Sequence, residues 1–293
     1  DDYDRSRDCL LKALGIEPSF VLAMINLCEL YTRFNQVDEA ISVADQALKI
    51  APNLAEIHWN RSLALLKKGD YEAGWGEFEW RFAKGQNQTI DPERYHQPRW
   101  GGEDISGQKL LVHDEQGHGD TIQFIRFIPL LKKYGATIIV QTKNTLIPII
   151  KTVSGVDEVI ERESDGNVQV SFDKHIPLLS LPNILQCQLS TIPMSVPYLT
   201  VSDSQVQKWN ERIGNGDLSV GIVWAGNPDQ LADRNRSATL SQFSALFDIS
   251  GVRFYSLQKG AAATQIKDYS DVEILCDLEG ELSTYEETAA AIM

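Results

Sequence analysis

The chain has 293 residues, of which 43% are hydrophobic and 23% are charged, and its net charge at pH 7 is −14. This composition is that of an ordinary globular protein with room for two or three domains. The acidic balance argues against nucleic acid or an anionic membrane surface as the main partner, because both require a basic face. No apolar run approaches the length of a membrane span, so we expect no transmembrane segment.

The four cysteines lie far apart and form no CxxC pair. This pattern favours free thiols in a cytoplasmic protein over a disulfide framework. No spacing of His, Asp, Glu or Cys indicates a metal site, and we expect no cofactor. The sequence starts inside one helical pattern and stops inside another, so we expect it to be a fragment of a longer protein.

The first 88 or so residues repeat with a period of 34 residues. Positions that match across one period are Pro18 with Pro52, Asn26 with Asn60, Asn35 with Gly69, and Ala40 with Gly74. A helix–turn–helix unit of this period is the tetratricopeptide signature. We predict a half repeat to about residue 19, a full repeat to about 53 and a divergent repeat to about 88.

The divergent repeat carries Arg81 where the pattern expects alanine. It is also rich in aromatic residues, which we expect to pack the repeats onto the next domain because a terminal repeat must cover its open face. These aromatic residues are Trp75, Phe78, Trp80 and Phe82. A linker with glycine and proline pairs is predicted to follow, at 85–88, 91–92, 97–98 and 101–102.

Strand and helix patterns alternate behind the linker. Strands are predicted at 109–113, 137–141, 158–160, 168–172, 219–224, 253–256 and 273–275. Helices are predicted at 121–134, 145–153, 203–213, 240–247 and from 285 onward. This alternation is typical of parallel sheets covered by helices. We therefore predict an α plus α/β protein, with tetratricopeptide repeats over 1–88, a first Rossmann-like lobe over 89–200 and a second over 201–293.

The most informative motif lies between the first strand and the helix that follows it. Its residues are Gln116, Gly117, His118, Gly119 and Asp120. A strand, a glycine turn and a helix start present backbone N–H groups and a polar side chain to a ligand. The glycines should let the chain turn sharply and let a substrate approach the backbone. The alternatives are that Asp120 only caps the helix and that His118 is merely exposed.

Two further motifs follow strands of the second lobe. Asn227 lies in a Gly-Asn-Pro turn that leads to Arg234 and Arg236, whose guanidinium groups suit phosphate oxygens. The alternative is a solvated surface loop. Gln258 and Lys259 follow the next strand and could reach a nucleotide base, ribose or phosphate. Here the alternative is a turn with an exposed lysine.

The order of seven short segments resembles that in bacterial tetratricopeptide proteins with a glycosyltransferase domain related to the heptosyltransferases, glycosyltransferase family 9. The segments are 100–102, 115–124, 177–182, 196–199, 221–228, 236–237 and 256–260. A more distant likeness is to protein O-linked N-acetylglucosamine transferases, which also join such repeats to a two-lobed transferase. The resemblance implies a GT-B-like pair of Rossmann lobes, with an acceptor on the first and a nucleotide-sugar donor on the second.

The resemblance also implies roles for individual residues. Asp120 matches the proposed catalytic base of the family, in a metal-independent, inverting reaction. Arg236 is the best match to the basic residue that stabilises the donor diphosphate, and Arg234 is the second choice. The family has a further donor loop after the helix that begins here near residue 285, and the sequence ends before it. We therefore expect the second lobe to be truncated.

These observations predict transfer of a sugar from a nucleotide-sugar donor to a hydroxyl on a glycan or protein, with the repeats recruiting the acceptor or a protein partner. The alternative is an inactive transferase fold that serves as a protein-binding scaffold. A dinucleotide oxidoreductase is disfavoured, because the glycine loop lacks a third glycine and has no clear ribose-binding acid at the expected distance. The sequence leaves the donor sugar, the nucleotide, the acceptor and the oligomeric state open.

Overall fold

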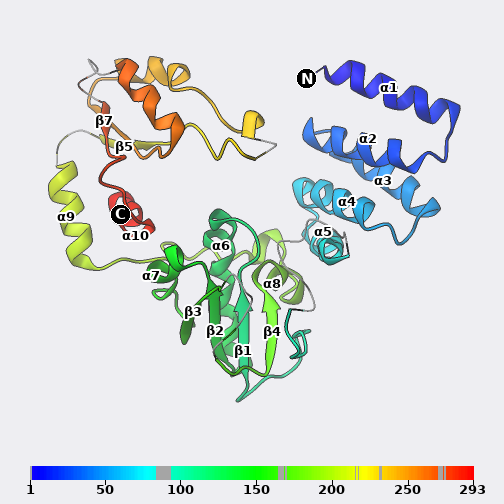
Figure 1. Cartoon of the computed structure of the whole chain (residues 1–293), viewed down its shortest axis with the longest axis horizontal. Coiled ribbons are helices and arrows are strands. Elements are labelled where there is room, and N and C mark those ends of the chain that lie inside the picture. Colours follow the sequence, from blue (N-terminus) through cyan, green and yellow to red (C-terminus); the bar gives the residue numbers. More distant parts are fainter. Residues whose placement is uncertain are drawn as a thin grey trace. The chain divides into compact units, whose positions relative to one another are not determined.

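The structure is a computed structural model that describes residues 2–83, 94–163, 168, 170–214, 216, 218–230, 233–269, 273 and 275–293, with the side chain of Arg234 excepted. The predicted linker segments 85–88 and 91–92 therefore lie outside the described residues, as does the predicted limit between repeats and first lobe. The chain divides into two compact units (Figure 1). Unit 1 comprises Asp1–Ile147 and Val153–Tyr198, and unit 2 comprises Pro148–Thr152 and Leu199–Met293.

Unit 1 begins with a helical region (Figure 1), whose helices are α1 (Tyr3–Ile16), α2 (Val21–Arg33), α3 (Val37–Ile50), α4 (Ala55–Lys68) and α5 (Tyr71–Phe78). A 3-10 turn, η1 (Glu79–Phe82), continues α5. Successive helices pack on one another, and α2 also contacts α4. The small residues Ala40, Ala44 and Ala47 are buried where α3 meets its neighbours, because small side chains allow close approach of helices. A helical N-terminal region is thus confirmed, and its assignment to tetratricopeptide repeats stays a prediction.

The sheet of unit 1 has parallel strands in the order β3-β2-β1-β4. They are β1 (Lys109–His113), β2 (Thr137–Thr142), β3 (Glu158–Glu161) and β4 (Lys174–Pro177). The chain runs outward from β1 to β3 and then returns to pair β4 with the other side of β1. The strands β1 and β2 are buried on both faces, which explains their nearly continuous apolar sequence. The carboxyl ends of β1 and β4 flank the point where the strand order reverses.

The predicted strand at 168–172 is wrong for the residues described there, and the edge strand is β4 instead. Pairing with β1 starts at Asp173, whose backbone N–H donates to the carbonyl of Lys109 and whose carboxylate accepts from the Lys109 N–H. Phe172 instead packs on the sheet face beside Leu111. The position of this edge strand is therefore determined by its contacts with β1 rather than by its own apolar pattern.

The helices of unit 1 are shorter than predicted. The predicted helix 121–134 is an α-helix only in its first part, α6 (His118–Phe124), and continues as the 3-10 helix η2 (Ile125–Tyr134). Pro129 lies inside η2, and proline removes a backbone donor and clashes with the preceding turn of an α-helix. Further short helices of unit 1 are η3 (Asn144–Leu146), η4 (Leu178–Ser180), α8 (Leu181–Ile184) and η5 (Leu189–Thr191). The short helix α7 (Ile147–Ile150) begins at the last residue of this part of unit 1, and its other residues belong to unit 2.

Unit 2 contains a second parallel sheet, ordered β5-β6-β7, with β5 (Leu218–Ile222), β6 (Val252–Ser256) and β7 (Leu275–Asp277). Its helices are α9 (Asp203–Ile213), α10 (Tyr285–Ile292), η6 (Asp233–Asn235), η7 (Leu240–Asp248) and η8 (Ala261–Tyr269). Helix α9 has the predicted bounds, because Ser202 caps its start and Gly214, with φ of 78°, follows its end. The predicted helix at 240–247 is 3-10, and the last strand begins at Leu275 rather than at 273.

The described residues form a helical N-terminal region and parallel α/β sheets, which confirms the predicted mixed α and α/β character. Within the described part of the chain, none of the helices combines the length and the apolar character needed to cross a bilayer. The same part holds no cluster of three or more His, Cys, Asp or Glu side chains with the geometry of a metal site.

Candidate functional site

The predicted glycine motif, here called loop 116–120, connects β1 to α6 in unit 1. Gly117 is the residue before the first residue of α6, and the Oδ2 atom of Asp120 accepts a hydrogen bond of 2.9 Å from the Gly117 N–H. Asp120 thus caps the start of its own helix from the third helical position. Its side chain is only partly covered, and its Oδ1 atom has no hydrogen-bond partner among the described residues. The cap and an open carboxylate oxygen are therefore present together.

The two glycines of the loop are not needed for an unusual backbone. Gly117 has φ of −81° and ψ of 171°, which any residue adopts, and Gly119 is helical. A Cβ added to Gly117 would lie 3.2 Å from Asp120 Oδ2, whereas one added to Gly119 would meet no atom within 4 Å. The expected sharp glycine turn is therefore wrong. Gly119 has open space where a side chain would lie.

His118 and Lys143 border the same loop. His118 Nε2 lies 3.1 Å from the hydroxyl of Thr145, and Lys143 Nζ donates to the carbonyl of Gln116 at 3.4 Å. Burial, and then the charge of Lys143, lower the pKa of His118 below its usual value. A neutral imidazole therefore lies beside the Asp120 loop at neutral pH.

The carboxylate of Asp114, a buried residue after β1 that is not among the predicted site residues, bonds to the ends of two other strands. Asp114 Oδ1 accepts from Arg162 Nη1 at 2.7 Å, and Oδ2 accepts from Thr142 Oγ1 and the Lys143 N–H. The ends of β1, β2 and β3 are thus fixed around one charge. The signal in the sequence is the pair Asp114 and Glu115, two acids that directly follow an apolar strand.

Glu115 forms a second buried ion pair, with Arg81 of the helical region. Arg81 Nε and Nη2 donate to the two carboxylate oxygens of Glu115 at 2.7 and 2.8 Å. Arg81 Nη2 also donates to Ser180 Oγ at 2.7 Å, and the Leu179 N–H donates to Glu115 Oε1 at 3.1 Å. Arg81, which departs from the predicted repeat pattern, thus bonds to residues that follow strands β1 and β4.

In unit 2, the loop after β5 brings Gly226 against Asp233, Arg236 and Ser237. Ser237 Oγ accepts from the Gly226 N–H at 2.8 Å and donates to Asp233 Oδ1 at 2.7 Å. A Cβ on Gly226 would lie 2.6 Å from Asp233 Oδ1 and 3.0 Å from Arg236 Nη2, so any larger residue would displace these two side chains. Arg236 Nε contacts Asp233 Oδ1 at 3.4 Å, and 58% of the Arg236 side chain is exposed. The Arg236 guanidinium thus lies close to the Gly226 backbone, and most of the Arg236 side chain is exposed to solvent.

The other predicted donor residues are arranged differently. Gln258 is buried, and its Oε1 accepts from the N–H groups of Trp224 and Ala225 while its Nε2 donates to the carbonyls of Ala225 and Lys259. Its amide thus braces the end of β5. Lys259 Nζ donates to the carbonyls of Glu279 and Leu282.

Asn227 is exposed, and its Oδ1 accepts from the Asp229 N–H. The structure therefore brings Arg236 to the Gly226 backbone and gives Gln258 a bracing contact. The side chain of Arg234 lies outside the described residues.

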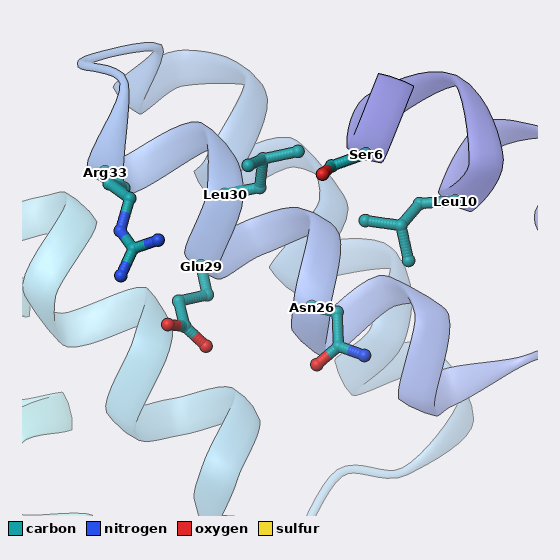
Figure 2. A pocket seen from close by; sticks show the side chains of 6 residues that line it. All are labelled: Ser6, Leu10, Asn26, Glu29, Leu30 and Arg33. Atoms are coloured by element: carbon teal, nitrogen blue, oxygen red, sulfur yellow. The ribbon is translucent and has the colours of Figure 1, made fainter. Parts of the chain in front are cut away.

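A groove of about 370 Å³ lies between α1 and α2 of the helical region (Figure 2). Leu10 and Leu30 give it an apolar part, and the amide of Asn26 and the charges of Glu29 and Arg33 border it. Figure 2 shows that Ser6 and Leu10 come from one helix and the other lining residues from the next. Asn26 is the residue that the 34-residue period relates to Asn60, whose Nδ2 donates to the Ile25 carbonyl.

No protein-family model matches the chain. Protein FlbA of Caulobacter vibrioides is 22% identical over 311 residues, a match that covers 96% of this chain and 52% of FlbA. The chain therefore spans about half the length of this relative.

Two solved structures are similar to the chain at a low level. ADP-heptose lps heptosyltransferase II of E. coli matches 63% of this chain and 76% of its own, at 13% identity and a TM-score of 0.43. A mutant of Thermobaculum terrenum O-GlcNAc transferase matches 95% of this chain and 71% of its own, at 9% identity and a TM-score of 0.28. These scores are too low to establish a shared fold.

Proposed function

We propose that the chain is part of a bacterial, cytoplasmic glycosyltransferase that moves a sugar from a nucleotide-sugar donor to a hydroxyl of a glycan or protein. The observation that carries the proposal is the chemistry at the strand ends of the two sheets. Loop 116–120 of unit 1 carries a carboxylate with one open oxygen, and the loop after β5 of unit 2 carries an exposed guanidinium. Carboxyl ends of parallel strands are where α/β proteins bind their ligands.

Asp120 is suited to act as the general base on the acceptor. In the proposed step the acceptor hydroxyl oxygen attacks the anomeric carbon and its proton passes to Asp120. The bond between that carbon and the diphosphate oxygen breaks, and its electron pair leaves with the nucleoside diphosphate. Attack opposite to the leaving group inverts the configuration at the anomeric carbon.

Arg236 is suited to stabilise the charge that grows on the leaving diphosphate. A guanidinium offers a planar set of donors to phosphate oxygens and does not need a metal to neutralise them. The Nε of Arg236 donates to Asp233 Oδ1, which restrains the guanidinium, and the greater part of the Arg236 side chain is exposed to solvent. The Gly226 N–H already donates to Ser237 Oγ, so we assign the phosphate contact to the guanidinium. We assign Gln258 to support of this loop, and Asn227, Lys259 and Arg234 stay predicted donor contacts.

The helical region is proposed to recruit the acceptor or a protein partner. Its groove between α1 and α2 is lined by two leucines, an amide and two opposite charges, a lining that suits a peptide segment.

The experiment uses the full-length protein and a panel of nucleotide sugars. A true donor should raise the melting temperature, because it binds only the folded state, and Arg236→Gln should weaken that shift. With that donor, Asp120→Asn should lower the transfer rate by about 100-fold or more, because it removes the base. Asp104→Asn is the matched control, since Asp104 is an exposed turn residue that bonds to Ser106. Transfer by Asp120→Asn at the wild-type rate would exclude Asp120 as the base.

A catalytically inactive scaffold is the second candidate, and one observation favours it. The bond from the Gly117 N–H to Oδ2 already gives Asp120 a structural role as a helix cap, which requires no catalysis. If no nucleotide sugar shifts the melting temperature of the full-length protein, the scaffold is the better description and the helical region becomes the main functional surface.

A further inference from the structure

The carboxyl ends of β1 and β4 mark the place where the strand order of the first sheet reverses. In open α/β sheets the loops on the two sides of such a point diverge and leave a crevice in which ligands bind. Here the two loops contain Glu115, which comes two residues after β1, and Ser180, which comes three residues after β4. Both residues are fully or almost fully buried, with exposed fractions of 3% and 0%.

The space between the loops that follow β1 and β4 is filled by Arg81, a side chain of the helical region. Arg81 of η1 donates from Nε and Nη2 to the two carboxylate oxygens of Glu115, and from the same Nη2 to Ser180 Oγ. Arg99 Nη2 also donates to that hydroxyl, whereas the guanidinium nitrogens that donate to Glu115 both belong to Arg81. Its remaining terminal nitrogen, Nη1, donates to the Phe78 carbonyl and to Glu79. Only 8% of Arg81 is exposed. The crevice that a ligand would use in other folds is therefore closed by a guanidinium from the preceding region of the chain.

Closure by Arg81 also determines the environment of Glu115. That carboxylate accepts from Arg81 Nε, Arg81 Nη2 and the Leu179 N–H, so two of its three donors come from one residue. Without Arg81 the carboxylate would be a buried charge with one donor, which is strongly unfavourable. It would have to take up a proton or move into water, and such a movement would carry the adjacent Gln116 and the start of loop 116–120.

A second contact holds the other end of the same segment. Trp75 of α5 packs edge-on against Phe124, the last residue of α6, with ring centroids 5.6 Å apart. The α5–η1 segment therefore touches the residue just before loop 116–120 and the end of the helix that starts there. The loop and Asp120 lie between these two fixed points.

We infer that Arg81 is a positioning residue, which plugs the crevice between β1 and β4 and fixes loop 116–120, and with it Asp120, from the helical region. The effect on catalysis rests on the proposed function. The effect on the order of the loop does not, since it follows from the contacts of Glu115 alone.

The test is hydrogen exchange of the whole chain, read in peptides that cover 115–121 and, for comparison, strand β2. Arg81→Met should raise exchange in 115–121 by about tenfold or more and leave β2 near its wild-type rate, because the unpaired Glu115 carboxylate moves toward water and carries the start of the loop with it while the sheet is intact. The double variant Arg81→Met/Glu115→Gln should return the loop to within about threefold of wild type, since it leaves no unpaired charge. A purely structural loss of contacts would not be rescued by removing a second one.

Arg61→Met is the matched control. Arg61 also joins two carboxylates, those of Asp45 and Glu77, but within the helical region. It should raise exchange in α3, α4 and the part of α5 around Glu77, and leave loop 116–120 unchanged because the pair of Arg81 and Glu115 is intact. If Arg81→Met does not fold, Arg81→Lys takes its place, because its single Nζ keeps the charge and loses the two-pronged contact.

Two results would overturn the inference. One is wild-type exchange of the loop in a folded Arg81 variant, and the other is an equal rise in the loop and in β2. If the full-length protein transfers a sugar, Arg81→Lys should lower kcat and leave the KM for the donor unchanged. If it transfers none, the proposed function fails while the exchange result still decides the role of Arg81.

Discussion

His113 and His175 lie beside each other on one face of the first sheet, on the neighbouring strands β1 and β4. His113 Nε2 and His175 Nδ1 are 3.2 Å apart, so one ring donates and the other accepts. Tyr95 packs against both rings. Burial, and then the partner histidine, lower the pKa of His113 well below its usual value, and burial and Arg99 lower that of His175 to about 4. Both are therefore neutral at pH 7.

This pair predicts that the stability of unit 1 falls as the pH drops from about 6.5 to about 4. In that window the unfolded chain binds protons that the folded chain does not, so each histidine lowers the free energy of unfolding by at most about 1.4 kcal/mol per pH unit. His175→Gln should make the dependence shallower in urea unfolding at a series of pH values. His96→Gln, a change at an exposed histidine, is the control. An equal slope in His175→Gln and wild type would contradict the burial argument.

At the scale of elements, the helical region ends two of its helices in the same way. Asn35 after α2 and Gly69 after α4 both have left-handed backbone, with φ of 65° and 91°. The two residues are 34 positions apart, so they match across one period of the sequence repeat. Left-handed residues close helix ends because their N–H groups reach the last free carbonyls, and the Gly69 N–H indeed donates to Leu66.

Gly69→Ala is therefore expected to lower the free energy of unfolding by about 1 kcal/mol, because alanine is strained at positive φ. No atom lies within 4 Å of the added Cβ, so the loss would come from the backbone alone. Gly76→Ala is a matched control inside α5, also with open space around its Cβ and without a positive φ. It should stabilise the protein by about 0.5–1 kcal/mol. Urea unfolding followed by circular dichroism measures both, and changes of the same sign would contradict the argument.

The helices and strands also show how much of the fold could be predicted from the sequence. The bounds of β1 and α9 agree with the prediction, because a buried apolar run and a Ser202 cap are local signals. The edge strand was predicted at 168–172 and is found at Lys174–Pro177, since its position depends on pairing with β1. The contact between Arg81 and Glu115 could not be predicted either. The two residues lie in different elements, and only the departure of Arg81 from the repeat pattern hinted at it.

For the whole molecule, the division into two units is the main feature. Each unit has its own buried clusters, around Ala44 and Leu111 in unit 1 and around Trp209 and Phe254 in unit 2. Compact units with separate cores unfold as separate cooperative steps unless a large apolar interface couples them. We therefore expect the chain to unfold in two transitions rather than one.

Two buried tryptophans allow that expectation to be tested with matched changes. Trp100 of unit 1 donates from Nε1 to the Glu103 carbonyl, and Trp209 of unit 2 donates from Nε1 to Glu287 Oε2, and both are almost fully buried. Replacing either with alanine should cost about 3–5 kcal/mol through the cavity that it leaves. Trp100→Ala should lower only the transition in which β1 loses protection from hydrogen exchange, and Trp209→Ala only that of β6. A single transition that moves in both variants would contradict this expectation and mean that the two units unfold as one cooperative step.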